Sequence, residues 1–316
     1  MSNDKTKGSA EVLKLAAAPD DMSKRLDILT AEKAGITRSQ VQKLIKDGHI
    51  LVNGKHENPG YKVRTSDMIE VRLPVQSRSA LVPEDLPLTI LFMDAYIAVV
   101  DKPAGMVVYP AAGHNDGTLM NALAYHAHKL ASIGGDLRPG VVHRLDKETS
   151  GTMIIALEDA AYYNLVEQFR KRSIHRKYIA LVSGQLKDDS GEIILAIGRS
   201  DSDRKKMSTR TRRGKEAVTR WKVLKRLSKA TLIEARLGTG RTHQIRVHFA
   251  AVGHPVLGDS TYGRKTEVEI KGRRILFPRH MLHAETLGFE HPRTGQFMEF
   301  SSPLPNDMQE CIEKLS

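Results

Sequence analysis

The stretch Gly140-Val-Val-His-Arg-Leu-Asp-Lys-Glu-Thr-Ser-Gly151 joins a short apolar run to a dense group of ionisable side chains, and a second apolar run covers residues 152–157. This order predicts a strand, a polar turn and a second strand, with the turn held between two buried elements. Catalytic groups are often carried by loops that a rigid scaffold fixes in this way. Asp146 in the turn is therefore a candidate catalytic residue, although an aspartate in a turn can also serve only to cap backbone N–H groups.

The length and charge of the chain point to two units and a polyanionic partner. At 316 residues the chain is long for one compact domain. Its formal net charge of +12 favours nucleic acid as the partner, ahead of a membrane surface. A generally basic, well-solvated surface would give the same sum, so the clustering of the charges has to decide.

Cysteine usage and hydropathy exclude several classes of protein. Cys311 is the sole cysteine, so the chain forms neither an internal disulfide nor a thiolate metal cage, and we expect a reducing, cytoplasmic setting. The N-terminus lacks the apolar run of a signal peptide, and no run of 18 apolar residues occurs, so no membrane span is expected. His243 and His248 lie off one helical face without a carboxylate nearby in sequence, so we expect no bound metal.

Composition and periodicity divide the chain into four segments. Residues 1–20 are polar and mixed, and we expect a mobile tail in which residues 12–16 are suited to an edge strand. A small module is expected over residues 21–75 and a proline-interrupted linker over residues 76–88. The second and larger domain then covers residues 89–316.

The small module has the pattern of two short helices followed by strands. Thr37 is expected to cap the second helix, and Gly48 ends it. Asn53-Gly54 between extended segments is a strong hairpin signal, and a last strand covers residues 68–73. Such a unit has a marginal core, which favours a binding role over an enzymatic one.

Basic side chains of this module would share one face if its helices pack together, and such a face suits a phosphate backbone without reading bases. These residues are Lys24, Arg25, Arg38, Lys43, Lys46 and Lys55. The module resembles the S4 RNA-binding domain. The matching residues are Arg25-Leu26-Asp27, Thr37-Arg38-Ser39, Ile45, Gly48, Val52-Asn53-Gly54-Lys55 and Asp67, and Ser66 stands where a glycine is frequent.

The larger domain alternates strand-like and helix-like segments. Thr118 is expected to cap one helix and Thr242 another that ends at Gly253. Further expected elements are a hairpin over residues 90–100, a helix over about 160–172, strands over 176–182, 217–226 and 230–237, and a terminal helix from Asn306.

A basic segment, residues 199–215, interrupts the larger domain. Eight of its seventeen residues are Lys or Arg, and only Asp201 and Asp203 oppose them. A solvated loop is the simple alternative, but in a basic protein the segment favours a clamp on a nucleic-acid backbone. The residues expected to bind RNA here are Arg204, Lys205, Lys206, Arg210, Arg212 and Arg213.

Several reaction classes fail on the motifs. His143-Arg144-Leu145-Asp146 is similar to a kinase catalytic loop, but the Asn, the Gly-rich loop and Asp-Phe-Gly are missing. The stretch Gly238-Thr-Gly-Arg241 lacks the spacing of phosphate-binding loops. There remain an aspartate flanked by arginines and a tyrosine entering a strand, which suit work on a base flipped out of RNA.

Three motifs resemble those of the RluA-type pseudouridine synthases. They are the opening stretch 140–151, Arg176-Lys-Tyr-Ile-Ala-Leu-Val182, and Gly240-Arg-Thr-His-Gln-Ile-Arg-Val-His248, and the match continues through Gly253-His-Pro255 and Leu257-Gly-Asp259. The resemblance covers roughly residues 86–316, with Tyr109-Pro110 where many members have His-Pro. It implies an α+β chain: a small αα-β S4-like module joined by a linker to a mixed, mainly antiparallel-sheet domain with peripheral helices.

The resemblance also implies an activity and roles. Uridine would be isomerised to pseudouridine without a cofactor, with Asp146 essential as nucleophile toward the base, nucleophile toward C1′, or base. Tyr178 would stack on the uracil and help remove the C5 proton. Arg246 would pair with Asp146, with Arg241 as the second choice for that partner. Substrate-binding residues would be Arg144, Arg241, His143, Ile245 and Lys177.

The branch and the alternatives follow from the same comparison. Domain order and Lys147-Glu148 favour the RluD-like branch, which acts on 23S ribosomal RNA, so we expect 23S RNA or pre-50S particles as partner and a monomer. A non-catalytic RNA-binding or ribosome-assembly factor would share the charge and the fold, but would not need Asp146, Tyr178 and Arg246 together. An RNA glycosidase would use a similar carboxylate and release uracil.

Overall fold

The computed structural model describes residues 11–73, 81–111, 113–203, 206–264, 266–270 and 272–316. The chain forms two compact units, one ending at residue 79 and the other beginning at residue 80. The first ten residues of the expected tail, residues 76–80 of the expected linker, and the expected RNA-binding residues Arg204 and Lys205 lie outside the described residues.

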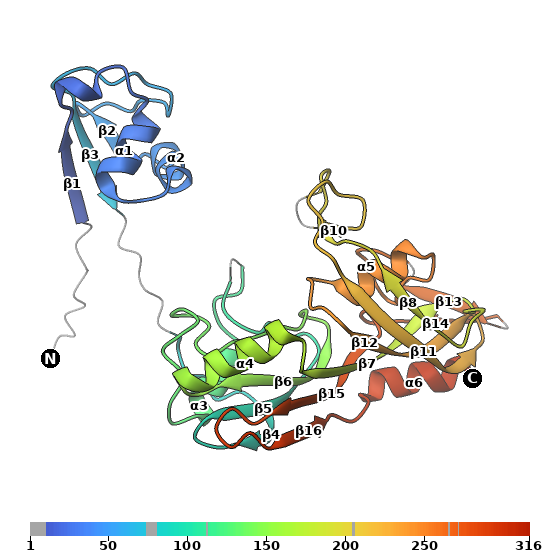
Figure 1. The fold of residues 1–316 in the computed structure, drawn as a ribbon. Helices are drawn as coiled ribbons and strands as arrows, with labels where there is room; N and C mark the ends of the chain where they lie inside the picture. The colour runs from blue at the N-terminus through green and yellow to red at the C-terminus, as the bar shows by residue number, and fades with distance from the viewer. Residues whose placement is uncertain (1–10, 74–80, 112, 204–205, 265, 271) are drawn as a thin grey trace, which may run out of the picture. The chain divides into compact units, whose positions relative to one another are not determined.

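The N-terminal unit is a three-stranded antiparallel sheet with two helices on it (Figure 1). Its strands are β1 (Glu11–Ala16), β2 (Ile50–Val52) and β3 (Met68–Leu73), with β3 in the centre. A 3-10 turn, η1 (Pro19–Asp21), precedes helices α1 (Leu26–Ala34) and α2 (Arg38–Lys46). Asn53 and Gly54 have φ of 50° and 75°, so both centre residues of the predicted tight turn are left-handed.

Strand β1 lies at an edge of this sheet, the position for which residues 12–16 were suited, so the expectation of mobility does not hold for this part of the tail. Its six residues pair with β3 from Glu11 opposite Leu73 to Ala16 opposite Met68. Leu13 and Leu15 lie two positions apart, so both face the core of the unit, against which they pack. Residues 11–16 are therefore part of the sheet rather than of a mobile tail, because the apolar side chains of Leu13 and Leu15 pack against the core of the unit.

A mixed, mainly antiparallel sheet of nine strands organises the larger unit, as the sequence predicted (Figure 1). The strand order is β4-β5-β6-β15-β7-β12-β11-β8, with β16 also pairing β15, and only β6 and β15 run parallel. The strands are β4 (Thr89–Met93), β5 (Ile97–Lys102), β6 (Ser150–Ala156), β7 (His175–Ser183), β8 (Ser190–Ile194), β11 (Val218–Leu227), β12 (Ala230–Leu237), β15 (Leu282–Glu290) and β16 (Phe297–Ser301).

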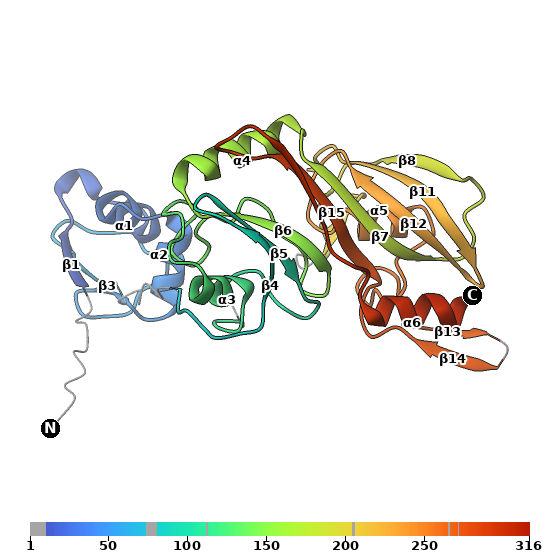
Figure 2. The ribbon, with the colours of Figure 1, turned by 90° about the horizontal axis from the view of Figure 1, so that it is seen from below.

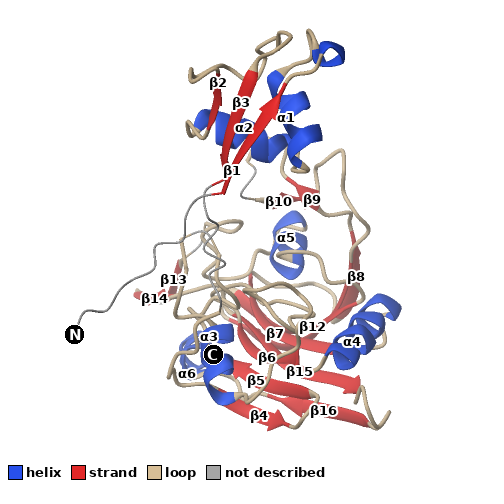
Figure 3. Ribbon diagram, turned by 90° about the vertical axis from the view of Figure 1, so that its left-hand side faces the viewer, coloured by secondary structure: helices blue, strands red, loops and turns tan. Residues whose placement is uncertain are grey.

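In the described part of this unit, four helices and two short hairpins accompany the sheet, and Figures 2 and 3 show how they are arranged around it. The helices are α3 (Leu119–His126), α4 (Asp159–Lys171), α5 (Gln244–Ala251) and α6 (Asn306–Leu315). The hairpins pair β9 (Gly198–Arg199) with β10 (Met207–Ser208) and β13 (Glu267–Ile270) with β14 (Arg273–Leu276). In the parts of the chain that the structure describes, no helix is long and apolar enough to cross a membrane.

Alternation along β7 explains how helices cover both faces of the sheet. Tyr178, Ala180 and Val182 belong to the core cluster that contains α3 and α5 side chains. Ile179 and Leu181 point to the other face, into a cluster with buried α6 side chains. Because strand residues alternate between faces, a single buried strand supports two cores, and Tyr178 faces the side where α5 lies.

Three local expectations need correction. Residues 81–88 do not behave as a linker throughout, because Glu84 N donates to Asn121 O of α3 and Asn121 Nδ2 donates to Val82 O. The expected first strand of the opening stretch reduces to one bridge, Val141 opposite Ile155. The third concerns the start of α5 and is described with the site.

Candidate active site

The turn after Asp146 is held by hydrogen bonds to the buried end of strand β5 and the residues that follow it. Thr149 N donates to Asp146 O at 3.0 Å, which closes the turn. Lys147 O accepts hydrogen bonds from Gly105 N and from Lys102 Nζ, at 2.9 and 3.0 Å. Lys102 is fully buried at the end of β5, and burial lowers the pKa of its amine to about 7. The backbone of the turn therefore rests on a strand that the sequence places more than forty residues earlier.

Arg279 holds the next part of the turn. Its Nη1 donates to Glu148 O at 2.9 Å, and its Nη2 donates to Ser150 Oγ at 3.3 Å. Asp307 of α6 accepts from its Nε and Nη2 at 2.7 and 3.1 Å, which compensates the buried charge. The guanidinium thus connects the turn to α6.

Two histidines complete this support. Thr149 Oγ1 lies 2.7 Å from His280 Nε2, and Ser150 Oγ lies 2.9 Å from His283 Nδ1. These contacts join parts of the chain about 130 residues apart, so no local pattern revealed them. The supporting residues that sequence reasoning missed are Lys102, Arg279, His280 and His283.

Arg246 of α5 pairs with Asp146, the partner that the resemblance implied. Its Nη1 donates to Asp146 Oδ2 at 2.8 Å. The second choice, Arg241, points elsewhere, because its Nε donates to Glu216 O at 3.2 Å. The side chain of Arg246 is only 8% exposed, so this ion pair is shielded from water.

Asp259 fixes Arg246 from the other side. Its carboxylate accepts from Arg246 Nε at 2.7 Å and from Nη2 at 3.0 Å. Burial alone would raise the pKa of Asp259, but the two bonds from Arg246 lower it below its ordinary value. Sequence reasoning assigned Asp259 no role, although it ends the motif Leu257-Gly258-Asp259 that extended the resemblance.

His243 is a further neighbour of Asp146. Its Nε2 lies 3.5 Å from Asp146 Oδ1, and its Nδ1 lies 2.7 Å from the Tyr262 hydroxyl. The guanidinium of Arg246 lies 5.2 Å from the centre of the Tyr262 ring. Burial lowers the pKa of His243, so the imidazole is neutral at neutral pH. From the sequence, His243 was considered only as a metal ligand, and no metal was expected there.

The start of α5 differs from the expectation that Thr242 caps it. The cap position is His243, with a left-handed φ of 56° and no side-chain hydrogen bond to the helix. Gln244 instead fixes the approach, because its Oε1 accepts from Arg241 N at 2.9 Å and from Thr239 Oγ1 at 2.7 Å. The hydroxyl cap that the sequence pattern favoured is therefore absent, and Gln244 holds the residues before the helix instead.

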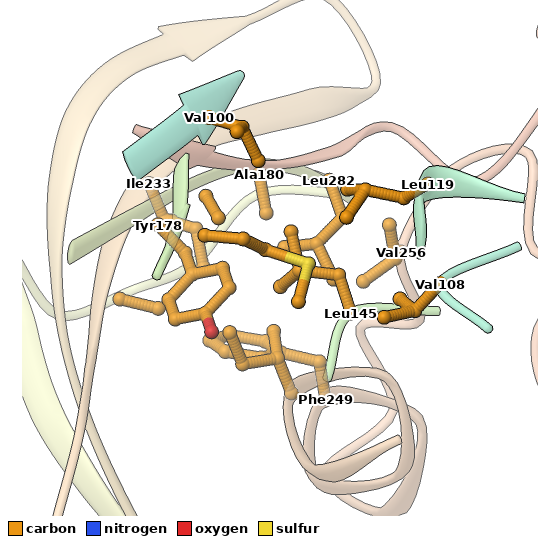
Figure 4. Packing of buried hydrophobic residues seen from close by; sticks show 14 of the residues in the cluster. Val100, Val108, Leu119, Leu145, Tyr178, Ala180, Ile233, Phe249, Val256 and Leu282 are labelled. Atoms are coloured by element: carbon orange, nitrogen blue, oxygen red, sulfur yellow. The ribbon is translucent and has the colours of Figure 1, made fainter. Parts of the chain in front are cut away.

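Tyr178, Asp146 and Arg246 line the same cavity. The cavity has a volume of about 580 Å³. Figure 4 shows the Tyr178 ring within the core cluster that also contains Leu145, Ile233 and Phe249. Burial raises the pKa of the Tyr178 phenol, and the nearby positive charge of Arg176 partly opposes this.

Most of the predicted site residues line this cavity, and one does not. The lining includes Asp146, Tyr178, Arg246, Arg144, Arg241, His143 and Ile245. Lys177 is the exception and corrects the prediction: its Nζ lies 2.6 Å from Glu285 Oε2, and it does not line the cavity. It precedes Tyr178 on β7, so its side chain leaves the opposite face of the strand.

His143 has a structural contact that the resemblance did not imply. Its Nε2 accepts a hydrogen bond from Ile154 N at 3.1 Å, and its ring lies 4.9 Å from that of Phe169. Burial lowers the pKa of His143 to about 3, so the ring is neutral at neutral pH. Its two contacts hold it between β6 and α4. Arg144 is exposed at the cavity and lies 5.9 Å from the centre of the Tyr109 ring.

The basic residues expected to bind RNA fall into two groups in the N-terminal unit. Arg25 and Arg38 both donate to the buried carboxylate of Asp27, which neutralises part of their charge. Lys24 pairs with Asp21 at 3.1 Å. Arg38 is itself exposed, as are Lys43, Lys46 and Lys55, and these three lysines have no ion pair among the described residues. Structural ion pairs therefore account for half of the expected basic face.

The basic segment 199–215 contains the β9–β10 hairpin, which projects from the larger unit (Figure 1). Arg210, Arg212 and Arg213 are exposed, whereas Lys206 is half-buried and lies 3.8 Å from Asp203. The segment presents charge to solvent rather than folding it into the core.

Comparison with known proteins agrees with this geometry. The profile of the family described as RNA pseudouridylate synthase matches residues 96–251, and that of the S4 domain matches residues 24–69. An uncharacterized RNA pseudouridine synthase of Bacillus subtilis is 43% identical over 302 residues, covering 95% of this chain and 97% of the relative. A ribosomal large subunit pseudouridine synthase D of Zymomonas mobilis is 43% identical over 285 residues, covering 89% and 90%.

A solved structure of a similar protein also matches the fold of this chain. Human RNA pseudouridylate synthase domain containing 1 aligns with a TM-score of 0.56 and 28% identity, covering 72% of this chain and 89% of that one. The chain belongs to the RluA family of RNA pseudouridine synthases and carries an N-terminal S4 RNA-binding domain. It is thus an enzyme that isomerises uridine in RNA.

Proposed function

We propose that this pseudouridine synthase acts on uridines of 23S ribosomal RNA, free or in pre-50S particles, with Asp146 as its catalytic carboxylate and without a cofactor. The target is supported by relatives at about 40% identity that are named for the large ribosomal subunit. The observation that carries the catalytic assignment is the 2.8 Å ion pair of Asp146 with Arg246, in a cavity also lined by Tyr178.

Asp146 is the group best placed to act on the ribose or the base. Arg246 donates a hydrogen bond to Asp146 Oδ2, and Asp259 holds that arginine in place through two further hydrogen bonds. The reaction breaks the N1–C1′ bond, turns the uracil and joins C5 to C1′, with loss of the C5 proton and gain of one at N1. A carboxylate can contribute by attacking C1′, adding to the base, or removing a ribose proton.

Tyr178 is assigned to the uracil. Its ring is a rigid aromatic surface beneath the cavity, suited to stacking on a flipped base. Its raised pKa keeps the phenol protonated at neutral pH. If its oxygen receives the C5 proton, the phenol must pass its own proton on, and Asp146 is the carboxylate that lines the same cavity.

The catalytic test is Asp146→Asn, which keeps the size and removes the charge. We expect normal RNA binding and loss of tritium release from RNA containing 5-tritiated uridine. Asp189→Asn is the matched control, because that carboxylate is 86% exposed and pairs with Arg226 on the surface. Full activity of Asp146→Asn would reject the catalytic assignment.

The target is tested by mapping pseudouridines in ribosomal RNA. Carbodiimide-dependent primer-extension stops are compared between cells with and without the gene, and purified protein is added back to RNA from the deletion strain. We expect stops in 23S RNA to disappear and return. Unchanged 23S stops would reject this substrate. Isomerisation leaves the mass of the RNA unchanged, whereas a glycosidase would release uracil.

A further inference from the structure

Arg176 shares the cavity with the catalytic groups, yet the proposed chemistry gives it no task. It lies two residues before Tyr178 on β7, so both side chains leave the same face of the strand. Both line the cavity. Arg176 is therefore a cation at the wall of the site, on the element that positions the proposed stacking ring.

Several other arginines of the cavity wall have carboxylate partners. Arg246 pairs with Asp146, Arg170 with Glu167 at 2.6 Å, and Arg172 with Glu216 at 3.5 Å. Among the described residues, no carboxylate oxygen lies within ion-pair distance of Arg176. Arg144 and Arg241 also lack a carboxylate there, but Arg144 is exposed. Arg241 and Arg176 are both half-buried, and Arg176 differs in that its Nε is buried without a partner among the described residues, whereas Arg241 Nε donates to Glu216 O.

The hydrogen bonds of Arg176 are also incomplete. Its Nη2 makes one long bond, 3.4 Å, to Leu237 O. Its Nε is buried and has no partner within the described residues. The guanidinium lies 5.5 Å from the centre of the Phe169 ring, which shields it without accepting a conventional hydrogen bond. Burial lowers the pKa of Arg176, so the charged form lacks compensation in the free protein.

Gly240 leaves the space that the guanidinium needs. A Cβ at this exposed position would lie 2.7 Å from Arg176 Nη1, closer than real side chains allow. The backbone of Gly240 is outside the left-handed region, so its conformation does not require glycine. Gly240 is exposed and lies beside the arginine of the wall that, within the described residues, has a buried Nε and no carboxylate partner.

We infer that Arg176 binds a phosphate of the RNA strand beside the flipped uridine, a role that rests on the proposed RNA substrate. An anion compensates the desolvated cation, and the anionic groups of RNA are its phosphates, since uracil is neutral. Arginine offers forked N–H donors that match phosphate oxygens. The contact would fix the backbone of the target while Tyr178 receives the base, so Arg176 is a substrate-binding residue.

The test measures RNA binding and turnover for Arg176→Ala, Arg176→Lys and Gly240→Ala. The probe is ribosomal RNA purified from cells that lack the gene, titrated from low to high potassium chloride. Arg274→Ala is the control, because this arginine is exposed on β14, pairs with Glu267 at 3.6 Å and does not line the cavity.

We expect Arg176→Ala to weaken binding about tenfold and to reduce the slope of log affinity against log salt by about 1, as for one phosphate that is no longer neutralised. Arg176→Lys keeps the charge without the fork and should retain most of the slope. Gly240→Ala displaces the guanidinium without deleting it and should weaken binding in the same direction. KM should rise more than kcat falls, and the control should match the wild type.

Two results would overturn the inference. One is an unchanged salt slope and affinity in folded Arg176→Ala and Gly240→Ala. The other is a fall in kcat with a shifted pH profile and normal RNA affinity, which would assign Arg176 to the Tyr178 phenol instead. Failure of the proposed function would be seen in the wild type, which would then form no pseudouridine in this RNA. Failure of the inference about Arg176 would be seen in the salt dependence of RNA affinity, which is measured without turnover.

Discussion

Asp259 accepts two hydrogen bonds from Arg246, at 2.7 Å from Nε and 3.0 Å from Nη2, and leaves Nη1 free to bind Asp146. One guanidinium thus bridges two carboxylates, one fully buried and one facing the cavity. The buried carboxylate fixes the direction of the arginine, whose Nη1 then points at Asp146. Asp259 is therefore a positioning residue.

Asp259→Asn should lower kcat more than RNA affinity. The amide cannot accept from both guanidinium nitrogens as a charge partner, and a small displacement of a positioned group can reduce the rate about 100-fold. Breaking this buried pair should also destabilise the fold, by about 3–5 kcal/mol for full removal of one partner in comparable cases. Single-turnover tritium release and denaturant unfolding measure the two effects. A variant with wild-type kcat would show that the reaction does not depend on Asp259 to position Arg246.

Gly151→Ala should destabilise the larger unit more than Gly253→Ala does. Both glycines have positive φ, 119° and 87°, so both substitutions strain the backbone. A Cβ at Gly151 would in addition collide with the carbonyl oxygen of Ala284, where β6 and β15 run parallel, whereas Gly253 has open space. We expect about 1 kcal/mol for Gly253→Ala and about 3 kcal/mol or more for Gly151→Ala. Unfolding in denaturant checks the order, and equal losses would contradict the close approach.

His143→Gln should change the pH dependence of stability. The histidine has a pKa of about 3 when folded, against an ordinary value of 6.5 for an exposed imidazole, so the folded chain binds fewer protons between these values. Above pH 6.5 the imidazole is neutral in the folded and the unfolded chain, and as pH falls toward 3 the wild type loses stability. The amide of glutamine can accept from Ile154 N without titrating.

The measurement is the free energy of unfolding at several pH values. Relative to the variant, the wild type should lose up to about 1.4 kcal/mol per pH unit below about pH 6.5, the slope for one proton. A constant difference between the two proteins over this window would show that His143 takes up its proton when folded.

Removing the exposed charges of the β9–β10 region should weaken RNA binding without changing the chemistry. For Arg210, Arg212 and Arg213, all changed to Ala, we expect a smaller salt slope, by about 1 for each phosphate that is no longer neutralised. The single-turnover rate at saturating RNA should stay near that of the wild type. Filter binding at several salt concentrations and tritium release measure the two quantities. A lost rate with normal binding would place these arginines in the catalytic step.

The local pattern of the sequence was enough for most elements of the larger unit. Alternation of polar and apolar residues predicted β11 and β12, and the Thr118 cap predicted the start of α3. These signals are local because a strand shows its two faces within a few residues and a cap acts within one turn. Where a local rule was wrong, as at Thr242, a more distant contact replaced it: Gln244 also donates to Val218 O on β11.

The motifs alone indicated the family and put forward Asp146, Tyr178 and Arg246 as its central residues, because the types of side chain that a chemistry requires can be read from the sequence. Only the tertiary structure decided how they are held. Arg279 and Lys102 reach the turn from distant segments, Asp259 orients Arg246, and Lys177 turns away. The physical reason is that hydrogen bonds and burial depend on distance in space, and folding brings together groups that the sequence keeps far apart.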